Sequence, residues 1–204
     1  MEETASKIFG YSYGSEESAR SPVSIEELEA LKTSTGITRE DQTFLERAGE
    51  VLKDQTKQIV EHWRSGIIAS IPNLARHSRT PSGEPLPAYL GNSNLRFQQW
   101  ILDTCFRAYD QEWLNYQQEI AVRHTSLKKN LTDGFPSTAF VPFRDIVAFA
   151  AVMNQTIKPY LAKQGDSAEM VEKMHQAWCK SIQLQLALWA KAYMDNAARG
   201  LNEW

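Results

Sequence analysis

A helical stripe that ends in a histidine is the feature that most restricts this chain. Its residues follow one another at spacings of three, four and four, and they are Trp113, Tyr116, Ile120 and His124. These spacings place the four side chains on one face of an α-helix, so that an imidazole projects from an otherwise apolar face. Such a histidine is more often a core residue bonded to a carbonyl, but it can also bind iron in a dry slot between helices.

Apolar residues recur at helical spacing along most of the chain, and no segment shows the strict alternation of a β-strand. The prolines at 72 and from 81 to 87 indicate a loop or single turns, and a second loop is expected over 130–136. The pattern predicts an all-α protein of about seven or eight helices. The expected helical segments are 24–36, 38–70, 90–109, 110–124, 143–161 and 166–193.

Local signals give the expected helix ends. Ser24 and Glu27 form a capping-box pattern, and so do Asp166 and Glu169. Gly49 lies within the long segment 38–70, where the low helix propensity of glycine predicts a break.

Length and charge limit the possible classes of protein. A chain of 204 residues suits one domain, with an extended arm over 1–21 and a single domain over 22–204. With 22 Lys and Arg against 25 Asp and Glu, no broad basic surface for nucleic acid is expected. The longest apolar run, 146–153, is too short to span a membrane, and the N-terminus lacks a secretory signal pattern. We therefore expect a cytoplasmic protein without membrane contact.

The cysteines and the usual catalytic motifs do not indicate a metal site, a disulfide or a catalytic site. Cys105 and Cys179 lie far apart in the sequence and form neither a metal-binding pair nor a disulfide framework. Phosphate-binding glycine loops and the His-Glu-x-x-His pattern are absent from the sequence. The sequence also lacks Cys-x-x-Cys-His, so any haem would be held without covalent attachment. No catalytic residue can be assigned from the sequence.

A haem pocket needs an imidazole for the iron, flat apolar walls and cations for the two propionates. His124 is the candidate iron ligand, and Arg96 is the candidate partner of a propionate. His77, in the proline-rich segment, is a weaker candidate as a second iron ligand. The expected walls are Phe97, Ile101, Phe149 and Met153, with Trp63 on the opposite side. Taken singly, an aromatic residue of this kind is more often part of ordinary core packing.

Three functions are compatible with these residues. The first is a haem protein whose ferrous iron reversibly binds O₂, CO or NO on the side opposite His124, for gas sensing or scavenging. The second is a haem enzyme that acts on peroxide, nitrite or NO, or that transfers reactive groups, in which Arg64 or His77 polarises a bound oxygen. The third is a haem-free interaction module in which His124 is structural. An absorption spectrum of the purified protein distinguishes the third from the others.

A family resemblance favours the first function. The sequence resembles protoglobins, single-domain relatives of the haem domain of globin-coupled sensors. The matching segments are 100–104, 109–117, 119–124 and 128–133, with support from 10–14, 49–55, 147–149, 158–162, 177–178 and 186–189. The resemblance thus extends over nearly the whole chain.

The resemblance implies a globin fold with an extra N-terminal helix and arm, non-covalent haem b, and His124 on the iron. The positions that match the family's pocket are Trp63, Phe97, Phe149, Met153 and Trp189. Tyr116 and Ile120, on the stripe of His124, complete the expected cofactor site. The resemblance also implies a homodimer through the last two long helices. The last helix agrees, because Leu184 and Leu188 form a second apolar flank that widens its apolar face.

The sequence departs from the family's pattern near the pocket. Many members carry a second histidine where this chain has Thr125, which leaves His124 as the one candidate ligand at that place. Members commonly have a tyrosine after the tryptophan that matches Trp63, whereas this chain has Arg64. The loss of that hydroxyl donor is expected to weaken O₂ binding relative to CO, because bound O₂ carries partial negative charge.

Overall fold

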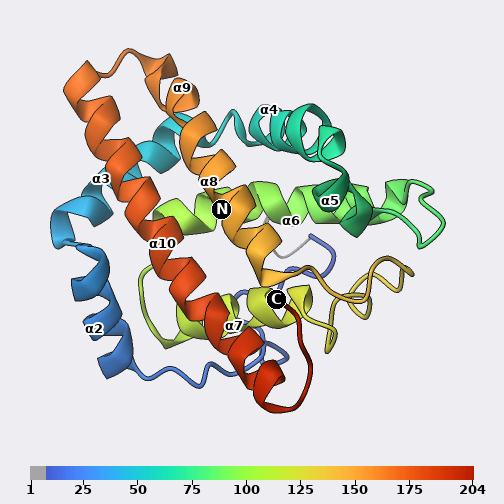
Figure 1. Cartoon of the computed structure of the whole chain (residues 1–204). Coiled ribbons are helices and arrows are strands. Elements are labelled where there is room, and N and C mark those ends of the chain that lie inside the picture. Colours follow the sequence, from blue (N-terminus) through green and yellow to red (C-terminus); the bar gives the residue numbers. More distant parts are fainter. Residues whose placement is uncertain (1–7) are drawn as a thin grey trace.

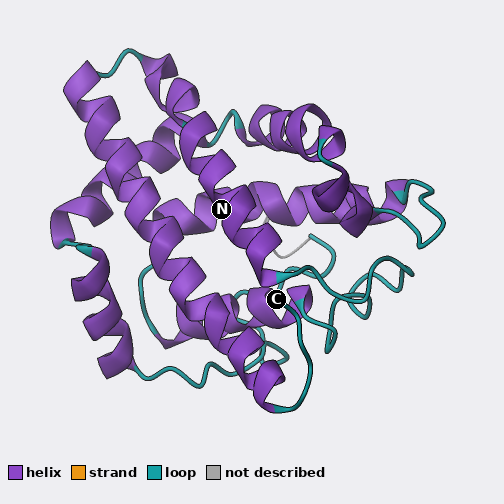
Figure 2. Ribbon diagram, in the orientation of Figure 1, coloured by secondary structure: helices purple, strands orange, loops and turns teal. Residues whose placement is uncertain are grey.

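The computed structural model describes residues 8–204, and this part of the chain is helical, as predicted, with connecting loops and one isolated bridge (Figures 1 and 2). The α-helices are α2 (Ile25–Thr35), α3 (Arg39–Leu52), α4 (Thr56–Glu61), α5 (Pro72–Ala75), α6 (Pro87–Phe106), α7 (Gln111–His124), α8 (Phe143–Thr156), α9 (Lys158–Leu161) and α10 (Ala168–Ala198). The π-helix η1 (His62–Ile67) and the short 3₁₀ helices η2 (Ile68–Ser70), η3 (Arg76–Ser78) and η4 (Ala162–Gln164) join them. No helix in this part is both long and apolar enough to cross a bilayer.

The predicted start of α2 is confirmed. The Ser24 hydroxyl accepts a hydrogen bond from the Glu27 backbone, and the Glu27 carboxylate accepts one from the Ser24 backbone. This capping box satisfies two backbone donors that have no partner within the helix. Asp110 caps α7 in a similar way through the backbone of Trp113, at 2.8 Å. This cap fixes the start of the helix that ends at His124.

The predicted capping box at Asp166 is wrong. Ser167 caps α10, because its backbone is extended and its hydroxyl accepts a hydrogen bond from Met170. Asp166 lies one residue too early and instead accepts two hydrogen bonds from Arg47, at 2.8 and 3.1 Å. A long-range ion pair thus takes the place of the local cap.

The long segment is broken near Gly49, as predicted, but the break lies a few residues beyond the glycine. Gly49 lies inside α3, and the chain leaves helical geometry only after Leu52. A Cβ atom at position 49 would lie 2.4 Å from the Phe106 ring on α6. Glycine is therefore required here for the close approach of two helices, and the packing outweighs its low helix propensity.

The long helix α10 organises the core and packs on α3, α7 and α8 (Figure 1). A second, smaller apolar cluster lies between α2, α7 and α10, and it contains Leu28, Trp113, Leu184 and Leu188. The second flank of α10 is thus covered within the same chain. The width of the apolar face therefore does not by itself indicate a dimer.

The arm is pinned to the helices through its aromatic side chains. The Tyr11 and Tyr13 rings both meet the Tyr116 ring edge-on, at centroid distances of 5.8 and 5.3 Å. The Tyr11 hydroxyl donates to Asp103 at 2.8 Å. The first seven residues of the predicted arm, 1–7, lie outside the described part of the chain.

Candidate functional site

A cavity of about 240 Å³ opens among α6, α7, α8 and α10, next to the arm and the segment 129–133. It brings together residues from most of the chain, from Gly10 to Trp189. The sequence-predicted site residues that line it are Arg96, Phe97, Tyr116, Ile120, His124, Phe149, Met153 and Trp189.

Trp63 and Ile101, which the sequence also places at the site, are fully buried and do not line the cavity. The Trp63 ring lies behind the wall, with centroid distances of 5.2 Å to Phe97 and 6.3 Å to Phe149. Its indole N–H donates to Thr156 at 2.8 Å. Trp63 thus supports the two phenylalanines that face the cavity.

His124 lies at the C-terminus of α7 with its ring in the cavity wall. Its Nδ1 lies 2.8 Å from the carbonyl of Ile120. A carbonyl can only accept, so Nδ1 carries the proton and Nε2 keeps a free lone pair. Burial, together with the positive charges of Lys129 and Arg64, lowers the pKa of His124 to about 4, although the hydrogen bond to Ile120 opposes this shift. The ring is therefore neutral at pH 7, the state that binds metals.

The surroundings of His124 hold the ring in place. The Trp189 ring is stacked on it, at a centroid distance of 6.2 Å and an interplanar angle of 19°. The Trp189 indole N–H donates to Gln117 on α7 at 2.9 Å. The His124 carbonyl accepts a hydrogen bond from Val141 at 2.8 Å. These contacts fix the orientation of the imidazole against two neighbouring segments.

Arg96 lines the cavity, but its charge is already compensated. Its guanidinium donates two hydrogen bonds to Asp133, at 2.6 and 3.0 Å, and a third to the Phe9 carbonyl. Paired in this way with a buried carboxylate, Arg96 is a poor partner for a further anion.

Two other cations face the cavity, and within residues 8–204 neither pairs with a carboxylate. Lys129 is buried, donates to Ser137 at 2.6 Å and lies 4.9 Å from the centre of the Tyr89 ring. Arg64 donates to Ser93 at 2.6 Å. Nothing in the sequence distinguishes Lys129 from Lys128, which does not line the cavity and pairs with Glu119.

The other histidines are occupied. His77 lines the cavity, but its Nδ1 bonds to Thr138 at 2.9 Å and its Nε2 to Asp145 at 3.0 Å. With both nitrogens engaged, His77 offers no lone pair for a second iron ligand. The remaining two histidines bond elsewhere: His62 to the Tyr160 hydroxyl and His175 to the Asn154 carbonyl.

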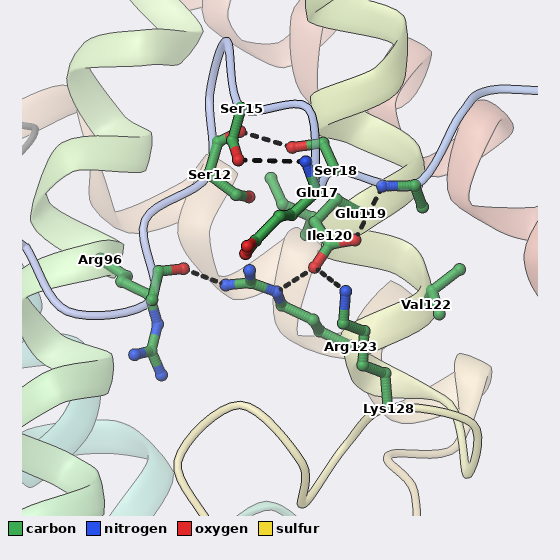
Figure 3. A network of polar contacts seen from close by, with 12 residues as sticks. Ser12, Ser15, Glu17, Ser18, Arg96, Glu119, Ile120, Val122, Arg123 and Lys128 are labelled. Atoms are coloured by element: carbon green, nitrogen blue, oxygen red, sulfur yellow. Dashed lines mark hydrogen bonds and ion pairs between the residues drawn. The ribbon is translucent and has the colours of Figure 1, made fainter.

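A polar network on α7 ties the arm over the cavity (Figure 3). Glu119 accepts hydrogen bonds from Arg123 at 2.6 Å and from the Ala19 backbone at 3.0 Å, and it pairs with Lys128 at 2.7 Å. Burial opposes the ionisation of Glu119, but the Lys128 hydrogen bond and the Arg123 charge outweigh it and lower the pKa. Arg123 also donates to the carbonyl of Gly10, which lines the cavity.

Comparison with known proteins shows the family and the fold of the chain. The sequence model of one family, Protoglobin, matches residues 25–199. The chain belongs to the protoglobin family. Among solved structures, the fold resembles the globin domain of the Geobacter sulfurreducens globin-coupled sensor, with a TM-score of 0.60 and 13% sequence identity. That match covers 81% of this chain and 96% of the other. A search of curated protein sequences gave no match.

Proposed function

We propose that this protoglobin binds haem b without covalent attachment and that its ferrous iron reversibly binds a diatomic gas. The observation that carries the proposal is the state of His124. Its Nδ1 is hydrogen-bonded to the Ile120 carbonyl, and its Nε2 keeps a lone pair beside an aromatic cavity. A single imidazole suffices, because the porphyrin supplies the other four nitrogen ligands.

The residues around the cavity fit a haem. His124 would hold the iron, and the wall contains flat and apolar side chains of the kind that pack on a porphyrin: Phe97, Tyr116, Ile120, Phe149, Met153 and Trp189. A haem carries two propionates, so the pocket needs positive charge. Lys129 is the cation we assign to a propionate, since Arg96 is paired with Asp133. Bound haem would supply the iron that takes a gas molecule.

The chain itself would keep the site dry and the imidazole neutral. The arm covers one side through Gly10, Tyr11 and Ser12, and the network of Glu119 and Arg123 holds the arm in place. The exclusion of water slows the oxidation of ferrous haem.

Absorption spectroscopy after haem reconstitution tests the proposal. The wild type should show a stoichiometric Soret band that shifts when CO is added to the reduced protein. His124→Gly should lose tight haem retention, and added imidazole should restore it by filling the space of the lost ring. His175→Gly is the matched control, because His175 bonds to Asn154 away from the cavity. Retention equal to wild type in His124→Gly without imidazole would contradict the proposal.

The second candidate function is a haem enzyme that acts on peroxide, nitrite or NO. The cationic Arg64 in the cavity wall favours it, because a guanidinium stabilises negative charge that develops on a substrate. Turnover with an electron donor well above that of free haem would support this function. Turnover equal to that of free haem would remove it.

We also propose a homodimer through α8 and α10, which pack against each other. Their outer surfaces expose apolar side chains, including Val147 at 42% and Met194 at 67%. Light scattering should show a dimer for the wild type and a monomer for the double variant Val147→Asp, Met194→Asp. Leu131→Asp, on an exposed loop residue, is the control. A dimer that survives the double change would contradict this interface. A cytoplasmic location stays a prediction from the sequence.

A further inference from the structure

Arg64 has surroundings that are unusual for a buried cation. It follows Trp63 in the π-helix η1, and its side chain lines the cavity. One terminal nitrogen donates to Ser93 at 2.6 Å, and the guanidinium carbon lies 5.3 Å from the centre of the Phe97 ring. Its Nε is buried and has no hydrogen-bond partner. The guanidinium is thus partly unsatisfied where it meets the cavity.

The other charges of the cavity wall do not compensate Arg64. Arg96 pairs with Asp133 and Arg123 with Glu119, while Asp145 is engaged by His77 and Arg76. Within residues 8–204, no carboxylate forms an ion pair with Arg64. Burial disfavours its charged form and lowers its pKa, yet a guanidinium stays protonated in proteins. A buried charge of this kind is stabilised by a counter-ion from outside the chain.

Arg64 and His124 both line the cavity, but they belong to different elements, η1 and α7. The π-helix with Arg64 directly follows α4, and His124 ends α7; Figure 1 shows α4 and α7 on opposite sides of α6. The Lys129 ammonium instead donates to Ser137 and to the His77 carbonyl, whereas the Arg64 guanidinium lies against the Phe97 ring. Arg64 is therefore the cation that a ligand on the side away from His124 would meet.

We propose that Arg64 makes this side of the cavity a binding site for a small inorganic anion, held between its guanidinium and the Ser93 hydroxyl. The inference rests on the proposed haem function, and it names the chemical class of a ligand for the ferric state. The anion must be small, because the Phe97 and Phe149 rings line the same cavity, whose volume is about 240 Å³. Two charge-assisted donors in a desolvated site favour an anion over a neutral ligand of the same size.

The test is an equilibrium titration of ferric, haem-loaded protein with sodium azide, followed in the Soret band. Arg64→Gln should raise the azide dissociation constant about 10- to 100-fold, the range for loss of a hydrogen bond to a charged group. Arg64→Lys keeps the positive charge but loses the planar guanidinium with its several donors. Its azide dissociation constant should lie between those of wild type and Arg64→Gln. CO binding to the ferrous form of Arg64→Gln should change less than about threefold, because CO depends little on hydrogen bonding. Arg79→Gln is the matched control, since Arg79 bonds to the Gly83 carbonyl outside this cavity.

The outcomes separate this inference from the haem proposal. Absence of a Soret band in the wild type contradicts the proposed function itself. With haem bound, an azide affinity of Arg64→Gln within about twofold of wild type overturns the role of Arg64 alone. Weaker haem retention in Arg64→Gln, with unchanged azide affinity in the loaded fraction, would also overturn it and would assign Arg64 to a propionate. An equal loss of azide and CO affinity would show a structural role and would likewise contradict the proposal.

Discussion

The close contact between α3 and α6 offers a test that is independent of any cofactor. Gly49 faces the Phe106 ring, and a Cβ at position 49 would lie 2.4, 2.6 and 2.8 Å from three of its ring atoms. These separations are far below ordinary carbon contacts of about 3.5–4 Å. The change Gly49→Ala must therefore displace the ring or separate the two helices.

The magnitude follows from two opposing effects. Overpacking of a core costs about 1–3 kcal/mol, and three overlapping ring atoms argue for the upper end. Replacing a glycine inside a helix by alanine contributes about 1 kcal/mol in the other direction. The net loss in the free energy of unfolding is about 2 kcal/mol. For a chain of this size, that corresponds to a fall in Tm of about 4–8 °C.

Urea unfolding of the haem-free protein, followed by helical circular dichroism at 25 °C, measures this difference. Gly91→Ala on α6 is the matched control, because a Cβ there meets nothing within 4 Å. The control should be more stable than wild type by about 0.5–1 kcal/mol. Adding Phe106→Leu to Gly49→Ala should recover part of the loss, since the shorter side chain relieves the overlap. The two changes should thus be non-additive by about 1 kcal/mol.

The refuting result is clear. If Gly49→Ala stabilises the protein as Gly91→Ala does, the close approach of α3 and α6 does not depend on the absence of a Cβ atom at position 49. Additivity of Gly49→Ala and Phe106→Leu would refute the contact as well.

Three further predictions concern buried polar groups. Glu119→Gln should lower the free energy of unfolding by about 2 kcal/mol. This value is smaller than that for a fully buried ion pair, because Arg123 and Lys128 are partly exposed. The same change should speed proteolysis within residues 8–21, whereas the control Glu172→Gln should match wild type in both assays. Thr156→Val should cost about 1–3 kcal/mol in urea unfolding, because the buried indole N–H of Trp63 loses its acceptor, and a loss below about 0.5 kcal/mol would contradict the importance of this bond. The folded-state pKa of His124 is lowered from 6.5 to about 4, so the unfolded chain takes up a proton first as pH falls. The free energy of unfolding of the haem-free protein should therefore fall by up to about 3 kcal/mol between these pH values. A stability–pH profile of His124→Gln that parallels that of wild type would contradict the assignment of this effect to His124.

Helix boundaries were predictable where a short polar side chain meets its own backbone. Ser24 with Glu27 and Asp110 with Trp113 are such cases, and both are as the local sequence indicates. The errors arose where a distant partner competes with the local signal. Asp166 pairs with Arg47 instead of capping α10, and Gly49 accommodates Phe106, so that α3 continues past the glycine to Leu52. In both, the deciding partner lies far away in the chain and leaves no mark on the local pattern.

The candidate site shows the same division. The stripe spacing placed Tyr116, Ile120 and His124 on one face of α7, and all three line the cavity. The sequence did not indicate that Trp63 lies behind the cavity wall or that Arg96 pairs with Asp133. Such pairing depends on the distances between helices, which periodicity does not contain.

The sequence by itself determined the helical class, the family and the identity of the one histidine with an apolar face around it. These properties depend on spacing along the chain and on local hydrogen bonds, which each segment carries with it. The tertiary structure alone decided which nitrogen of His124 is free, which flank of α10 is already covered, and which cations of the cavity lack a partner. Those properties depend on distances between groups that only folding brings together. They also depend on the removal of water, which strengthens each polar pairing and makes an unpaired buried group costly.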